Sequence, residues 1–272
     1  LRGTALLEVN NLVKKFGTNV ALNNVSFVTD KPEVIGVIGR SGAGKSTLLR
    51  TINRLNRATS GEVLVDGVDV LKLRGDEKLR WQKDCAMIFQ QFNLVNRLDV
   101  ITNVILGSLN TQPSLKAMLK LFSDEDRSTA LRLLDRFGMI DTALQRAETL
   151  SGGQQQRVAI CRAMMQQPKF ILADEPIASL DPLNARLVMD ALHRINREEN
   201  ILVICNLHTL DTARNYCDRV IGMRMGEIVF DGPSSELTDE MAREIYGAEA
   251  DEAFEPGVTS TALGETPIAA GA

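Results

Sequence analysis

The chain has 272 residues, of which 44% are hydrophobic and 24% are charged, and its formal net charge is −4. This length suits one large α/β domain or two small ones, and the composition is that of an ordinary globular protein. There is no excess of basic residues of the kind that favours nucleic acid, and no apolar run approaches the roughly 18 residues of a membrane span. Nucleic acid is therefore not an expected partner.

The first quarter of the chain predicts strands around a glycine-rich loop. Two short strands are expected at about 5–9 and 20–28, with a turn at Phe16 and Gly17 between them. Residues 34–38 are β-branched and too apolar to be half exposed, so they predict a buried central strand. The glycine-rich stretch 39–47 follows this strand directly.

After this loop the predicted elements alternate less regularly. A helix is expected at about 48–55, and residues 61–67 predict a strand that ends in an Asp-Gly turn. From Asp76 to Arg146 helix-type apolar spacing dominates, with one strand near 85–89. This region has the character of a mostly helical insertion.

Two more buried strands follow the insertion, at 170–173 and 201–205, and a helix at about 184–198 separates them. Buried strands that alternate with helices predict a mainly parallel α/β sheet. From Ala248 onward the periodicity stops, and residues 248–272 contain five acidic residues and no basic one. Such a tail cannot bury enough apolar surface to order itself, so we expect it to be disordered.

The four cysteines show no metal-binding or redox spacing. Each of them, Cys85, Cys161, Cys205 and Cys217, lies in or beside an apolar stretch. We expect them to be small buried hydrophobic residues, which is the usual role of free cysteine.

The glycine-rich loop matches the phosphate-loop pattern G-x-x-x-x-G-K-[ST], and it lies between a predicted buried strand and a predicted helix. In such a loop successive N–H groups point at phosphate oxygens, the lysine neutralises the β and γ phosphates, and the serine hydroxyl can bind Mg²⁺. The expected nucleotide-binding residues are Gly39, Arg40, Ser41, Gly42, Ala43, Gly44, Lys45, Ser46 and Thr47.

Two adjacent carboxylates follow the predicted strand 170–173. Open α/β sheets bind ligands at the carboxyl ends of their strands, and two buried carboxylates need a cation or a proton-transfer role. We expect Asp174 to reach the magnesium shell and Glu175 to act as general base toward the attacking water.

The chain has only two histidines. His193 is expected on a polar helix face exposed to solvent, whereas His208 follows the strand 201–205 at the same sheet edge as Asp174. From this position the ring of His208 could bond the γ-phosphate.

A second candidate anion site precedes another predicted helix, in Leu150-Ser-Gly-Gly-Gln-Gln-Gln-Arg157. Ser151 can cap this helix, and Gly152 and Gly153 allow a close approach of bare backbone to a ligand. Gln154 completes the Leu-Ser-Gly-Gly-Gln pattern.

These motifs together resemble the ATP-binding subunits of ABC transporters, over about residues 5–247. The resemblance implies a phosphate-loop ATPase core with a mainly parallel sheet, an amino-terminal antiparallel β subdomain and an inserted helical subdomain at about 91–146. It implies that ATP and Mg²⁺ are the cofactors. It further implies that Phe16 stacks on adenine, that Gln90 touches the magnesium and the membrane partner, and that Asp181 belongs to the loop of Ser179-Leu-Asp181.

The resemblance also implies the partners and the location. Two copies of the chain face each other head to tail, so that Ser151 of one closes on the γ-phosphate held by Lys45 of the other. Integral membrane permease subunits, and indirectly a substrate-binding protein, complete a transporter whose ATPase lies peripherally on the cytoplasmic face of the inner membrane.

Within this family, residues 89–98, 103–107, 113–122 and 172–182 are most similar to phosphonate importers. Cys161, where alanine is commoner, and Asn206, where threonine often precedes Leu-His, depart from the common pattern without removing a catalytic group. Three alternatives remain open: an importer of another cargo such as polar amino acids, a soluble ABC ATPase not involved in transport, and a non-catalytic nucleotide-binding regulator. The last is disfavoured because both Glu175 and His208 are present.

Overall fold

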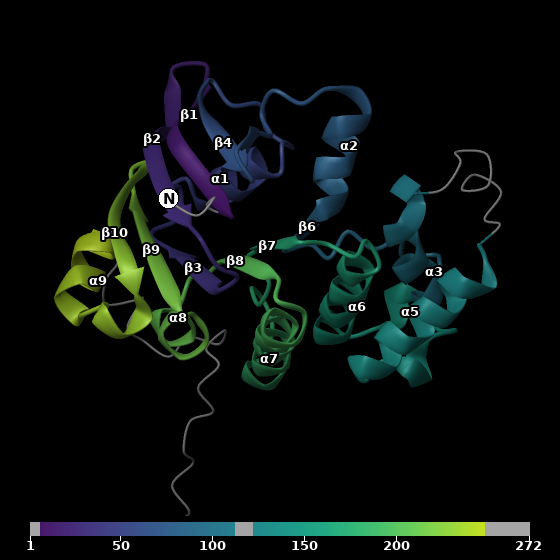
Figure 1. Ribbon diagram of the computed structural model, residues 1–272. Coiled ribbons are helices and arrows are strands. Elements are labelled where there is room, and N and C mark those ends of the chain that lie inside the picture. Colours follow the sequence, from purple (N-terminus) through teal and green to yellow (C-terminus); the bar gives the residue numbers. More distant parts are fainter. Residues whose placement is uncertain (1–5, 112–121, 248–272) are drawn as a thin grey trace, which may run out of the picture.

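The computed structural model describes residues 6–111 and 122–247. The expected disordered tail at 248–272 and nearly all of the segment 113–122 lie outside these described residues. Figure 1 shows two sheets, with the amino-terminal one at the top and helices packed below the other.

The amino-terminal sheet is antiparallel, as the resemblance implied. Its four strands run in the order β2 (Asn19–Thr29), β1 (Leu7–Phe16), β4 (Ser60–Val65) and β5 (Val68–Asp69). The first two strands are longer than expected, because they pair along most of their length from Leu7↔Thr29 to Phe16↔Asn19. This pairing places Phe16 at the turn, beside the phosphate loop.

The second sheet has six strands in the order β10-β9-β3-β8-β7-β6. The strands β3, β6, β7, β8 and β9 are parallel, and only the edge strand β10 is antiparallel. Their bounds are β3 Val34–Ile38, β6 Cys85–Ile88, β7 Phe170–Asp174, β8 Leu202–Asn206, β9 Arg219–Arg224 and β10 Glu227–Pro233. The mainly parallel α/β sheet is therefore confirmed.

Each of the central strands is buried on both faces. In β3, Ile35 and Val37 join a core with α1 and the antiparallel sheet, whereas Val34 and Ile38 join a second core with the helices on the opposite side. The sequences of such strands are continuous apolar runs because helices or a second sheet cover both faces of the strand. All five residues of β3, of β7 and of β8 are buried.

The helices begin at the residues that their caps dictate. Ser123 and Ser151 each form a capping box, with Asp126 and Gln154 respectively, which satisfies the first amide groups of α5 and α6. The α-helices are α1 Lys45–Ile52, α2 Gly75–Asp84, α3 Val100–Ile105, α5 Asp124–Arg136, α6 Gly152–Met164, α7 Pro182–Glu199, α8 Leu210–Tyr216 and α9 Asp239–Tyr246, and the short 3₁₀ helices are η1 Leu106–Thr111, η2 Ile140–Thr142, η3 Ala147–Thr149 and η4 Ser234–Glu236.

All four cysteines are buried and unpaired, as expected. Burial raises the pKa of the thiols of Cys85, Cys161 and Cys205 to about 12, so they stay protonated at neutral pH. Across 6–111 and 122–247, no helix combines the length and the apolarity needed to cross a bilayer. His193 is only partly exposed, rather than fully solvated as expected.

Candidate nucleotide site

The phosphate loop joins the end of β3 to the start of α1. Gly44 caps the helix in a left-handed conformation, with φ of 104°, and a Cβ at this position would lie 2.4 Å from the carbonyl oxygen of Ala21. Only glycine fits both restraints. Helix α1 consequently starts at Lys45, three residues before the expected start, and its first amide groups lie at the loop itself.

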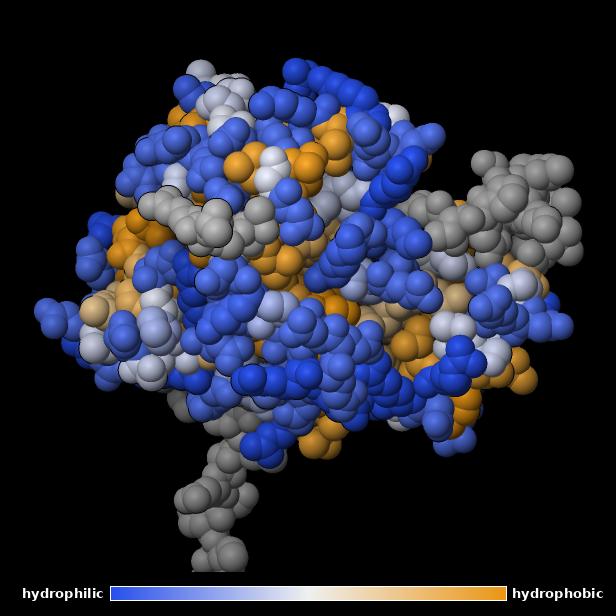
Figure 2. Space-filling model, viewed as in Figure 1, coloured by the Kyte–Doolittle hydropathy of each residue, from blue (hydrophilic) through white to orange (hydrophobic). Residues whose placement is uncertain are grey.

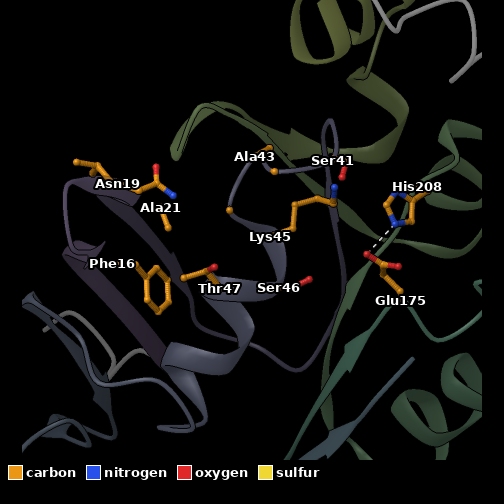
Figure 3. Close-up of a pocket in the computed structure, with 13 residues that line it drawn as sticks. Phe16, Asn19, Ala21, Ser41, Ala43, Lys45, Ser46, Thr47, Glu175 and His208 are labelled. Atoms are coloured by element: carbon orange, nitrogen blue, oxygen red, sulfur yellow. Dashed lines mark ion pairs between the residues drawn. The ribbon is translucent and has the colours of Figure 1, made fainter. Parts of the chain in front are cut away.

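A pocket of about 320 Å³ opens beside this loop. Figure 3 shows Phe16 and Thr47 on one side of it, Lys45 at its centre, and Glu175 with His208 on the other side. Phe16 is 48% exposed, and the Nζ of Lys14 lies 4.4 Å from the centroid of its ring. The lining residues are Phe16, Asn19, Val20, Ala21, Ser41, Gly42, Ala43, Gly44, Lys45, Ser46, Thr47, Glu175 and His208.

The ammonium group of Lys45 lies inside the loop rather than in solvent. The residue is 4% exposed, and its Nζ donates to the carbonyl oxygens of Gly39 at 2.6 Å and Arg40 at 3.0 Å. A buried cation that donates to these neutral carbonyl groups is well placed to attract an anion.

Glu175 and His208 form an ion pair on the opposite side of the pocket, with 2.8 Å between Oε1 and Nε2. The hydrogen bond from His208 lowers the pKa of the Glu175 carboxyl, and the charges of His208, Lys45 and Arg50 act in the same direction. Glu175 has a φ of 55°, a strained value for a non-glycine residue. Glu175 directly follows Asp174, the last residue of β7, and it lines the pocket.

Asp174 is held by two residues that the sequence did not single out for this site. Its Oδ2 accepts from Nη2 and Nε of Arg50 at 2.9 and 3.1 Å, and its Oδ1 accepts from Nδ2 of Asn206 at 2.9 Å. The same amide nitrogen donates to Oγ of Ser46 at 3.1 Å. One signal was available in the sequence, since Arg50 is four residues after Ser46 on one helix. That Asn206 ends the strand next to the one that Asp174 ends is known only from the order of the strands in the sheet.

The segment Ser151–Gln154 starts α6 and packs against α7 of the same chain. A Cβ on Gly153 would lie 2.2 Å from Oδ1 of Asn184, so this glycine is required by a close approach. Asp181 caps α7, accepting from the backbone N–H of Asn184 at 3.0 Å and from its Nδ2 at 2.6 Å, and these bonds lower the pKa of Asp181. No residue of α6 is among the described residues that line the pocket of its own chain.

Comparison with known proteins identifies the family. Residues 22–178 match the ABC transporter family. The chain belongs to this family. It is 59% identical over 258 residues to the phosphonates import ATP-binding protein PhnC of Ruegeria pomeroyi, which covers 95% of this chain and 94% of that protein. The corresponding protein of Rhizobium johnstonii is 58% identical, over 95% of this chain and 92% of its own length.

Solved structures of ABC ATP-binding cassettes have the same fold. A dimeric cassette in a post-hydrolysis state, bound to ADP and Pi, matches with a TM-score of 0.74 and 33% identity, over 84% of this chain and 98% of that chain. A cassette in its ADP conformation matches with a TM-score of 0.77 and 27% identity, over 93% and 99% of the two chains. As an ABC ATPase, this protein binds ATP.

Gln90 lies apart from the pocket of this ABC cassette. It is exposed, two residues beyond the end of β6, and it does not line the pocket that Phe16 and Lys45 share. The loop after it is held by Arg162 of α6, whose guanidinium donates to the carbonyl oxygens of Phe92 at 2.7 Å and Asn93 at 2.5 Å. Nothing in the spacing of the sequence pointed to Arg162, because this contact joins residues about seventy positions apart.

One more residue outside the expected set supports the site. Tyr246, at the end of α9, donates its hydroxyl hydrogen to the backbone carbonyl of His208 at 3.0 Å. Burial raises the pKa of this phenol, so it remains a donor. The last described helix thus holds the loop that carries His208.

Proposed function

We propose that this chain is the ATP-hydrolysing motor subunit of an importer that takes up phosphonates. One observation carries the proposal: Lys45 and the start of α1 face the Glu175–His208 pair across a single pocket that also has an exposed aromatic ring. This arrangement suits a nucleoside triphosphate. The cargo is proposed from the 55–59% identity to proteins named for phosphonate import.

The pocket holds ATP by its two ends. Phe16 stacks on adenine, and the residues of the loop 39–47 surround the phosphates with backbone N–H groups. Lys45 releases its two loop carbonyls and pairs with the β and γ phosphates. The amide groups at the start of α1 add to the positive potential.

The donor set beside the loop fits Mg²⁺. Ser46 and Asp174 are bridged by one amide group, and Oδ1 of Asn206 is buried with no partner among the described residues. No group of three or more His, Cys, Asp or Glu side chains able to hold a metal ion occurs within 6–111 and 122–247. Mg²⁺ suits such an incomplete set, because it binds one or two protein oxygens together with phosphates and water. Ser46, Asp174 and, from its exposed loop, Gln90 would hold the ion, which would neutralise charge on the phosphates.

Glu175 is the general base in the proposed hydrolysis. Its pKa is lowered, so the carboxylate is ionised and can accept a proton from water. Nε2 of His208 lies 2.8 Å from Oε1 of Glu175 and so occupies one of its two oxygens. When ATP is present, His208 turns its N–H to the γ-phosphate, which frees Glu175 to accept the proton of the attacking water.

Two copies of the chain complete each site. Ser151, Gly152, Gly153 and Gln154 do not line the pocket of their own chain, yet the start of α6 offers backbone donors to an anion. We propose that they, together with Asp181, act on the nucleotide held by a second copy. The dimeric cassette that matches this chain supports the proposal.

The membrane partner docks on the region from 91 to 146. Figure 2 shows a mostly hydrophilic face with apolar patches at the lower right, over the side of the molecule where Figure 1 places α5. Within the region from 91 to 146, Leu144 is 85% exposed, and Leu131, Ile140 and Val95 are also exposed. Docking on permease subunits would place the ATPase peripherally at the cytoplasmic face of the membrane.

Growth on a single phosphorus source tests the cargo. Cells that lack this protein should fail to grow on a phosphonate and should still grow on phosphate. Restoring the wild-type chain should restore growth, whereas Glu175→Gln, which keeps the shape and removes the base, should not. Normal growth of the deletion strain on phosphonates, without a second phosphonate transporter, would assign the motor to another cargo.

Mixed dimers test the shared site. Lys45→Ala disables the phosphate loop of one chain, and Ser151→Arg disables the start of α6 in the other. If the two residues act across the interface, a mixed dimer has one intact site and traps about one nucleotide when both chains also carry Glu175→Gln. No trapping in a dimer shown to form would contradict the shared site.

A further inference from the structure

Asn206 is a buried amide at the point where the proposed metal ligands meet. It is the last residue of β8, it lies opposite Asp174 of β7 in the parallel register, and it is 0% exposed. Its Nδ2 donates to both Asp174 and Ser46, which come from different elements. The amide therefore fixes the separation between a carboxylate and a hydroxyl that are far apart in the sequence.

The orientation of this amide is determined by its neighbours. Turning the group over would place Oδ1 against the carboxylate oxygen of Asp174, which also accepts only. The observed orientation leaves Oδ1 buried without a partner among the described residues. A buried acceptor without a partner is unfavourable, so the two N–H bonds to Asp174 and Ser46 must decide the orientation.

Arg50 holds the other oxygen of Asp174 in a different way. Its side chain is 47% exposed and reaches Oδ2 from α1 with both Nε and Nη2. The guanidinium places a positive charge at the carboxylate that is proposed to face the metal ion. Because it is exposed and carried on a long flexible stem, Arg50 can move away, whereas the buried amide of Asn206 cannot.

We propose that Asn206 is a positioning residue that keeps Asp174 and Ser46 in the arrangement that accepts Mg²⁺, and that Arg50 is an exchangeable counter-charge that competes with the ion for Asp174. The inference rests on the proposed binding of Mg²⁺ with ATP. It requires Asn206 and Arg50 to have opposite influences on the effect of Mg²⁺ on nucleotide binding. Removing the amide weakens the effect of Mg²⁺ on nucleotide binding, and removing the guanidinium strengthens it.

Binding of a fluorescent ATP analogue, mant-ATP, measured in EDTA and over a range of Mg²⁺ concentrations, tests both residues without relying on turnover. Asn206→Leu keeps the branched shape and removes both donors. Loss of a residue that orients a metal ligand typically lowers metal affinity about 10–100-fold. The gain in mant-ATP affinity caused by Mg²⁺ should fall by at least about tenfold, while the affinity in EDTA stays within about twofold of wild type.

Arg50→Met keeps the aliphatic stem and removes the charge. The Mg²⁺ concentration for half-maximal effect should fall about two- to fivefold, the size expected for an ion pair with a half-exposed partner. Cys205→Ala, on the preceding residue of β8, is the matched control for general damage to the strand, and it should leave the effect of Mg²⁺ unchanged.

Three results would overturn the inference. The first is an equal loss of affinity in EDTA and in Mg²⁺ for Asn206→Leu, which means a merely structural role. The second is an unchanged Mg²⁺ effect in that variant. The third is an Arg50→Met variant that needs more Mg²⁺ than wild type. Because Arg50 is half exposed, this variant should fold, so it tests the inference even if Asn206→Leu does not fold. Failure of the wild-type chain to bind mant-ATP both in EDTA and at the highest Mg²⁺ concentration would instead refute the proposed function.

Discussion

Replacing Gly153 by alanine should destabilise the folded chain, although alanine is the better helix former. Gly153 lies in the first turn of α6, where the substitution by itself would contribute up to about 1 kcal/mol to stability. The added Cβ, however, would lie 2.2 Å from Oδ1, 2.3 Å from Cγ and 2.6 Å from Cβ of Asn184. Rotating the side chain of Asn184 relieves the first two contacts but not the third, so α6 and α7 must separate.

The size of the loss follows from these contacts. Overpacking of this kind costs about 1–3 kcal/mol, and rotating Asn184 also gives up its 2.6 Å bond to Asp181. After the gain in helix propensity, the free energy of unfolding should fall by about 1–2 kcal/mol. For a chain of this size the melting temperature should fall by about 2–8 °C. Thermal unfolding followed by circular dichroism measures it.

The neighbouring glycine is the matched control. A Cβ on Gly152 would lie 3.4 Å from Cδ2 of Leu180 and 3.7 Å from Cζ of Phe92, which are ordinary contacts. Gly152→Ala should therefore melt within about 1 °C of wild type or above it. Adding Asn184→Gly to Gly153→Ala removes all three close atoms, so the double variant should melt higher than the sum of the single effects predicts. A Gly153→Ala chain as stable as wild type would refute the reasoning.

Three further predictions concern the site and the core. Glu175→Gln should bind nucleotide like wild type in a filter or fluorescence assay but hydrolyse it about 10²–10⁴ times more slowly, and hydrolysis at the normal rate would exclude Glu175 as the base. Because the folded-state pKa of Glu175 lies below its ordinary value of 4.5, the stabilising effect of its bond to His208 is present above that value and is lost as the pH falls through the lowered pKa. The difference in melting temperature between wild type and His208→Ala should shrink correspondingly in acid, and a difference that grows below pH 4.5 would contradict this sign. The four buried thiols should react with a thiol reagent only after denaturation, and labelling of more than one per native chain would contradict the burial of Cys85, Cys161, Cys205 and Cys217.

The sequence by itself determined the features that depend only on interactions between residues close together in the chain. The phosphate loop could be predicted because its glycines, lysine and serine are adjacent and lie between a buried strand and a helix. The capping by Ser151 was predictable for the same reason, since a cap and its amide groups are within three residues of each other. Continuous apolar runs likewise indicated β3, β7 and β8 as strands covered on both faces. The alternating, half-exposed edge strand β10 has no such run.

The tertiary structure alone decided which residues meet around these local features. Arg50, Asp174 and Asn206 lie on a helix and two strands, and only the register of the parallel sheet brings the last two together. The requirement for glycine at position 153 likewise comes from Asn184, thirty-one residues later, and not from the helix that contains it. Contacts of this kind depend on how elements pack, and a side chain carries no local signal of a partner that the chain brings to it only after folding.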